Sequence, residues 1–263
     1  MYRGCIMKNI YRFLFGRFFW IQFSTQLKYK GTWRKGLFHG RGTLKYANGS
    51  IYTGEFFKGS KNGYGHFISS EAYEYIGDWV GGKQTGNAQI NYKNGDFYTG
   101  KVKDGLRNGY GELFQVSSSR NYKGKWATDT LQGELEITDP NWTFYGSMDV
   151  STGSGSGTFN YKDKSKYVGG VVGFKREGEG TLEFKSGEII SGIWSENVNV
   201  NAASIIDEHG FHWMGNLHNM QPSGRMKTKR PDGIIYDSVW ENGAMLQSLS
   251  VVNNKKIDVQ TLN

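Results

Sequence analysis

The chain has 263 residues, including 38 glycines, 3 prolines and a single cysteine, which excludes an intramolecular disulfide. Hydrophobic residues make up 37%, too few for a thick two-layer core. Residues 1–54 contain ten Lys and Arg and no acidic residue, so the net charge of +8 is concentrated there. The remaining residues are nearly neutral, and we therefore expect no nucleic-acid partner.

Residues 1–28 form a basic, aromatic segment, for which three interpretations stay open. It could cap the first hairpin, anchor the chain at a membrane interface, or act as a mitochondrial presequence. Read as a helix, residues 8–23 have one apolar face, formed by Ile10, Leu14, Phe18 and Ile21. In the anchor interpretation, the residues expected to contact anionic lipid are Lys8, Arg12, Arg17, Phe18, Phe19 and Trp20.

An aromatic–glycine–aromatic signature begins at Tyr29-x-Gly31-x-Trp33 and occurs ten times in all, almost always 23 residues apart. A fixed period in this range is typical of a repeat array. Because successive signature residues are two apart, they share one face of a strand. The predicted repeat framework consists of Tyr29, Gly31, Trp33, Tyr52, Gly54, Tyr75, Gly77, Trp79, Tyr98, Gly100, Tyr122, Gly124 and Trp126.

Each repeat has a second half with paired glycines, such as Gly40 and Gly42. Glycine beside strands of aromatic residues marks a close approach, so we expect each aromatic ring to lie over glycines of a neighbouring strand. A turn position follows each signature, and most residues there tolerate positive φ. Phe174 and Met220 do not, and we expect their turns to be built differently.

Basic pairs recur before the second strand of several repeats, at Lys61-Asn62, Lys83-Gln84 and Arg107-Asn108. We expect them to line one edge of the sheet as a basic row. Such a row serves solubility, or it contacts acidic headgroups or an acidic partner.

No motif in the chain predicts catalysis, a cofactor or a metal. His212 and His218 would share a strand face roughly 20 Å apart, too far for one metal ion. The glycine-rich stretch 154–158 falls on the paired-glycine position and lacks the ending of a phosphate loop. Residues 246–263 leave the repeat and are expected to form a C-terminal cap.

The repeat resembles the MORN (membrane occupation and recognition nexus) family, whose core Tyr-x-Gly-x-Trp-x-x-Gly-x-x-x-Gly-x-Gly is complete from Tyr29 to Gly42. The resemblance implies an all-β fold, an elongated single-layer antiparallel sheet of about ten consecutive β-hairpins over residues 29–245. It also implies a non-enzymatic scaffold that joins protein partners in a larger assembly. The alternative is a peripheral tether that binds anionic phospholipid through the N-terminal segment and the basic edge. The expected location is intracellular, at the cytoplasm, cytoskeleton, cilium or mitochondrion.

Overall fold

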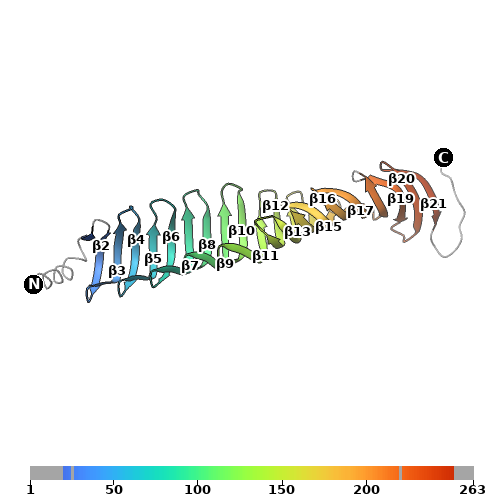
Figure 1. Ribbon diagram of the computed structural model, residues 1–263. Helices are drawn as coiled ribbons and strands as arrows, with labels where there is room; N and C mark the ends of the chain where they lie inside the picture. Colours follow the sequence, from blue (N-terminus) through green and yellow to red (C-terminus); the bar gives the residue numbers. More distant parts are fainter. Residues whose placement is uncertain (1–19, 25–26, 219–220, 252–263) are drawn as a thin grey trace, which may run out of the picture. The chain divides into compact units, whose positions relative to one another are not determined.

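The computed structural model describes residues 20–24, 27–218 and 221–251 (Figure 1). Every regular element in these residues is a strand, and the 21 strands belong to one antiparallel sheet. The predicted single layer of consecutive hairpins is thereby confirmed. The chain divides into two compact units, residues 1–132 and 133–263, which are described separately below.

In unit 1, neighbouring strands in the sequence pair with one another, as in β2 with β3 and β3 with β4. The strands are β1 (Ile21–Ser24), β2 (Leu27–Arg34), β3 (Leu37–Tyr46), β4 (Ile51–Phe57), β5 (Ser60–Ile68), β6 (Tyr73–Val80), β7 (Lys83–Tyr92), β8 (Phe97–Lys103), β9 (Leu106–Gln115) and β10 (Arg120–Ala127).

Strand β11 (Thr130–Thr138) contains the boundary between the units, and unit 2 continues the same pattern of pairing. Its strands are β12 (Trp142–Asp149), β13 (Ser154–Tyr161), β14 (Lys166–Val172), β15 (Lys175–Glu183), β16 (Ile189–Ser195), β17 (Val198–Ile206), β18 (His212–His218), β19 (Gln221–Lys229), β20 (Ile235–Glu241) and β21 (Ala244–Val251).

Glycines of successive strands face one another and form a row across each unit. The register places Gly31 opposite Gly42, and Gly42 opposite Gly54. In unit 1 the row continues through Gly65, Gly77, Ala88, Gly100, Gly111 and Gly124. In unit 2 it consists of Gly146, Gly157, Gly169, Gly180 and Gly192. This row leaves space for a ring to lie against the backbone.

A tyrosine ring fills that space. Tyr29 covers Gly31 on its own strand and Gly42 on the next, so closely that a Cβ at Gly42 would overlap the ring. The Tyr29 hydroxyl donates a hydrogen bond to the carbonyl of Thr32 at 3.0 Å. Both contacts recur at fully buried Tyr52, Tyr98 and Tyr167. The ring-over-glycine packing expected from the sequence is therefore present, and Phe144 makes the ring contact without a hydroxyl.

Edge-to-face contacts join the rings of one repeat to those of the next. The Tyr29 ring lies 5.1 Å from Trp33 on its own strand and 5.2 Å from Phe56 in the following repeat, measured between centroids. Tyr52 lies between Phe56 and Trp79, 5.1 Å from each. Each such pair contributes about 0.5–1.5 kcal/mol beyond the area it buries. A chain of rings thus supports the backbone ladder of unit 1.

Eight connections between described strands are two-residue turns with positive φ at both positions, the geometry of type I′ turns. The turn N–H reaches one repeat back, as from Gly59 to the carbonyl of Phe38 at 2.9 Å. The turns therefore extend the ladder between repeats. At the second turn position, φ lies between 62° and 88° in Gly36, Gly59, Gly82, Gly105, Asp129, Phe174, Asn197 and Gly243.

The expectation of a different turn at Phe174 is wrong. Phe174 has a φ of 62° at the same turn position, and its ring stacks on Trp142 with centroids 6.0 Å apart. Positive φ strains a bulky residue by about 1–3 kcal/mol, and the ring contact offsets part of that cost. The connection that departs from a two-residue turn at this position of the repeat is the four-residue loop 150–153, where Gly153 has positive φ. Met220 lies outside the described residues.

Strands occupy both ends of the described chain. Ile21 lies in β1 opposite Tyr29, so it does not belong to the helix that the pattern of residues 8–23 suggests. At the other end, β21 pairs with β20. Residues 1–19 and 252–263 lie outside the described residues, and the expected roles of the two ends as caps stay predictions.

Replacing Gly111 with alanine should destabilise the protein by about 1–3 kcal/mol, because the new Cβ would overlap the Tyr98 ring. Urea unfolding measures this change. Tyr110→Ala is the control, since its side chain is 63% exposed on the opposite face and should change stability by less than about 0.5 kcal/mol. Equal losses in the two variants would contradict the packing described.

Candidate functional site

The two faces of the sheet carry different side chains. We call the face that carries the tyrosines and the glycine row the aromatic face, and the opposite face the polar face. The framework tyrosines Tyr29, Tyr52, Tyr75, Tyr98 and Tyr122 are all buried on the aromatic face. The predicted framework residues therefore pack repeats together, while the polar face of the same strands is open to ligands.

Three cations lie over rings of the aromatic face, each at the second residue of its strand. Lys61 Nζ lies 4.3 Å from the centroid of the Trp79 ring. The guanidinium carbons of Arg107 and Arg176 lie 4.2 and 4.5 Å from the centroids of the Trp126 and Trp194 rings.

The expected basic row at the sheet edge is wrong for two of its members. Strands β5 and β9 begin one residue before Lys61 and Arg107, so both side chains turn onto the aromatic face instead of lining a turn. Lys83 does remain exposed, and it pairs with Asp104 at 3.0 Å.

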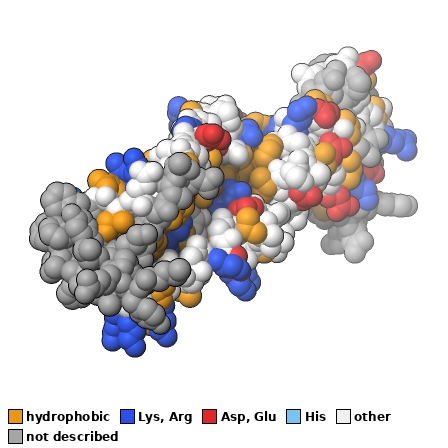
Figure 2. Space-filling model, turned by 60° about the vertical axis from the view of Figure 1, so that its left-hand side comes forward, with side chains coloured by type: hydrophobic (Ala, Val, Ile, Leu, Met, Phe, Trp, Pro, Cys, Tyr) orange, Lys and Arg blue, Asp and Glu red, His pale blue; other side chains and the backbone are white. Residues whose placement is uncertain are grey.

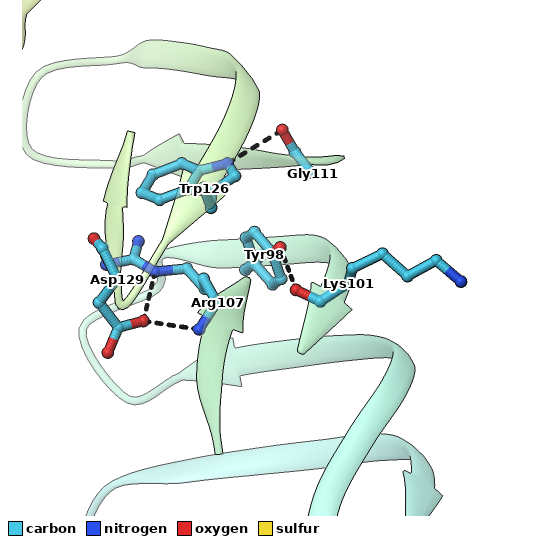
Figure 3. Close-up of polar contacts among 6 residues, drawn as sticks. All are labelled: Tyr98, Lys101, Arg107, Gly111, Trp126 and Asp129. Atoms are coloured by element: carbon cyan, nitrogen blue, oxygen red, sulfur yellow. Dashed lines mark hydrogen bonds and ion pairs between the residues drawn. The ribbon is translucent and has the colours of Figure 1, made fainter. Parts of the chain in front are cut away.

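Arg107 is fixed by the turn of the following repeat (Figure 3). Asp129 Oδ1 accepts hydrogen bonds from the Arg107 backbone N–H at 2.8 Å and from its Nε at 3.0 Å, and Arg107 Nη2 donates to the Asp129 carbonyl at 3.0 Å. The adjacent Trp126 indole donates to the carbonyl of Gly111 at 3.1 Å. With these donors engaged inside the protein, Arg107 joins repeats and is poorly placed to bind a ligand.

The same arrangement recurs in unit 2 with an amide in place of the carboxylate. Asn197 Oδ1 accepts from the Arg176 backbone N–H at 2.8 Å, and Arg176 Nη2 donates to the Asn197 carbonyl at 2.7 Å. The signal in the sequence was the pairing of an arginine with a turn Asp or Asn one repeat later, which the sequence analysis missed.

Lys61 has no such partner, because Gly82 occupies the corresponding turn position and offers only its backbone N–H to the Lys61 carbonyl. Burial among rings lowers the pKa of Lys61 to about 8. Within the described part of the chain, no carboxylate forms an ion pair with it. Lys61 is therefore a desolvated cation held by aromatic rings.

An open groove of about 750 Å³ lies on the polar face of β2 to β5. It follows the glycine row, and its lining includes the side chains of Lys30, Arg41, Glu55 and Tyr64. Trp20 closes one end, with Lys45 Nζ 4.5 Å from the centroid of its ring. Figure 2 shows Lys and Arg side chains among hydrophobic ones near the N-terminal end.

Trp20 is the one predicted membrane-contacting residue that the structure describes, and it is 39% exposed. Lys8, Arg12, Arg17, Phe18 and Phe19 lie outside the described residues. Within residues 20–24, 27–218 and 221–251, no helix is long and apolar enough to cross a membrane. The same residues contain no group of three or more His, Cys, Asp or Glu side chains able to hold a metal ion.

The stability of the protein should rise between pH 8 and about 9.5 relative to a Lys61→Met variant. Folded Lys61 loses its proton at about pH 8, whereas the unfolded chain keeps it to about 10.5, so the unfolded state binds more protons in this window. Urea midpoints measured at several pH values test this. The window ends below pH 10, where ionisation of tyrosines in the unfolded chain lowers stability. If the urea midpoints of the natural protein and of Lys61→Met change equally with pH, the pKa of Lys61 is not lowered in the folded protein.

Replacing Asp129 with glycine should cost about 1–3 kcal/mol, because the carboxylate bonds to Arg107 are lost. Asp129→Asn should retain most of the stability, since Asn197 accepts the equivalent backbone bond in unit 2. Thermal and urea unfolding compare the two variants. If glycine proves as stable as asparagine, the side chain at this turn does not join the repeats.

Comparison with known proteins finds a repeat pattern in this chain. The MORN repeat pattern matches five segments, residues 29–51, 52–70, 75–97, 98–118 and 167–189. Mouse alsin is 28% identical over 206 residues, and human alsin is 27% identical over 198. These matches cover 74% and 72% of this chain but only 10% and 9% of alsin, so the chain spans about a tenth of the length of these relatives.

Two solved structures show weaker likeness. The TCP10 domain of Danio rerio CPAP, in complex with a peptide of Danio rerio STIL, is 12% identical with a TM-score of 0.42, covering 84% of this chain and 93% of that domain. A CPAP G-box domain is also 12% identical, with a TM-score of 0.45, covering 71% of this chain and 98% of that domain. The five matched segments show that this chain contains MORN repeats, and the sheet of consecutive hairpins is consistent with them.

Proposed function

We propose that the chain is a non-enzymatic scaffold that holds protein partners within a larger assembly. The observation that carries this proposal is that the two faces of the sheet differ: the side chains of the aromatic face are buried between repeats, and those of the polar face are exposed. Rings, glycines and cations of the aromatic face are used to pack one repeat on the next. The polar face of the same strands carries exposed tyrosines, with Tyr64 59% and Tyr110 63% accessible. Tyrosine is enriched at protein interfaces, where its ring and hydroxyl both contribute.

The repeat type also supports a non-catalytic role, because MORN repeats are structural units without catalytic chemistry of their own. Repeat arrays present long surfaces, while catalysis needs unlike groups gathered at one point. We place the protein in a cytoskeletal or membrane-associated assembly, in keeping with its family.

A second candidate is a peripheral tether on anionic membranes. The concentration of ten basic residues and no acid in residues 1–54 favours it, since each basic residue near such a surface contributes about 1 kcal/mol. In this alternative, residues 8–23 of the N-terminal segment and the exposed basic side chains at the sheet edge provide the contact.

The scaffold proposal predicts that Tyr64→Ala with Tyr110→Ala reduces recovery of native partners without lowering the melting temperature, because both side chains are largely exposed. Quantitative affinity purification from the native cells, under mild salt, measures the recovery. Phe57→Ala with Val80→Ala is the matched control, because these side chains are 48% and 63% exposed beside the turns.

Two results would contradict the proposal. In one, the full chain co-purifies with no protein at all. In the other, it is recovered only on anionic vesicles, which would favour the membrane tether.

A further inference from the structure

The first hairpin collects its positive charge on one face. Strands β2 and β3 and their turn carry six Lys and Arg residues. Side chains alternate along each strand, and the aromatic face of this hairpin takes Tyr29, Gly31 and Gly42. Five of the six basic residues therefore project from the polar face: Lys28, Lys30, Arg34, Arg41 and Lys45.

These cations lack the carboxylate partners that some cations of later repeats have. Arg107 pairs with Asp129 and Lys83 with Asp104, each at 3.0 Å. Among the residues that the structure describes, no carboxylate forms an ion pair with Lys28, Lys30, Arg34 or Arg41. Glu55 is the sole acidic side chain of the described residues that lines the groove. The polar face of this hairpin is thus a concentrated positive surface, and Glu55, which lies opposite Arg41 on β4, compensates only part of it.

The shape of the groove favours an extended anionic peptide over a flat anionic membrane. Lys30 and Arg41 line a recess whose floor is the glycine backbone, between exposed Tyr64 and Trp20. Three strand spacings of about 4.8 Å separate β2 from β5, which matches four to five residues of an extended chain at about 3.3 Å each. A flat bilayer would not reach the floor of such a recess, whereas an extended peptide would.

We propose that the groove over β2 to β5 binds an extended acidic segment of a protein partner, with carboxylates on Lys30 and Arg41 and an apolar or aromatic side chain against Tyr64 or Trp20. This inference rests on the scaffold function proposed above and names the chemistry of one partner. The chain's own C-terminal residues 252–263 are a poor occupant, because Lys255 and Lys256 outweigh Asp258.

The test uses the full chain and a fluorescent poly-glutamate peptide of about eight residues that contains one tyrosine, with fluorescence anisotropy as the readout. We expect saturable binding that weakens by about tenfold between about 50 and about 500 mM salt, because exposed charges are screened. The variant Lys30→Glu with Arg41→Glu should weaken binding by at least about tenfold.

The matched control is Lys101→Glu with Lys125→Glu, which makes the same change of net charge on the polar face of β8 and β10, outside the groove. This control should bind the peptide within about twofold of the unchanged protein. Circular dichroism melts confirm that both variants are folded.

Four results would overturn the inference: no binding, equal loss in the two variants, tighter binding to vesicles of about 30% phosphatidylserine than to the peptide, or salt-sensitive self-association that occupies the groove. A fifth result, equal recovery of native partners by the groove variant and the unchanged chain, would leave the scaffold function standing and overturn the groove assignment.

Discussion

A tyrosine ring pressed against two glycines that face each other across neighbouring strands is the contact on which this structure depends. A single-layer sheet has no second layer to cover its apolar face, so its side chains must cover the backbone themselves. Glycine admits a ring close to the strands, since a Cβ at Gly42 or Gly111 would overlap Tyr29 or Tyr98. Ala88 is the one other residue in the row of unit 1. The tyrosine hydroxyl then satisfies a carbonyl three residues on. The result is buried aromatic core without a packed partner layer.

The remaining variation between repeats is built on this frame. At three of the signature tryptophans, Trp79, Trp126 and Trp194, a cation from the preceding strand covers the indole. Where that cation is arginine, the next turn supplies Asp129 or Asn197 to hold it. These contacts bury the side chains of the aromatic face, so the polar face is the one exposed to partners. The scaffold proposal follows from that division, and the basic groove is its most chemically defined region.

Much of the fold could be predicted from spacing alone. Glycine and aromatic residues two apart give the strand faces, and the 23-residue period gives the hairpins. Spacing alone could not predict that the side chains of Lys61 and Arg107 lie on the aromatic face. That depends on where the preceding turn ends, because a longer turn would leave both residues at the edge of the sheet. Residue preference alone predicts an unusual turn at Phe174, but stacking of its ring on Trp142 accompanies the ordinary turn geometry there. The composition shows that residues 1–54 are basic and contain no acidic residue. Only the strand register shows that the basic side chains of the first hairpin lie on one face.

The central claim is that ring and glycine act as a unit, and a double-mutant cycle between Tyr98 and Gly111 tests it most directly. Urea unfolding would compare Gly111→Ala in the natural background and in a Tyr98→Ala background. The account predicts that the cost of the added methyl group falls by at least about 1 kcal/mol once the ring is removed, since the three atoms that a Cβ at Gly111 approaches most closely all belong to Tyr98. Strictly additive losses would show that the glycine row is needed for some reason other than the ring, and would contradict the account.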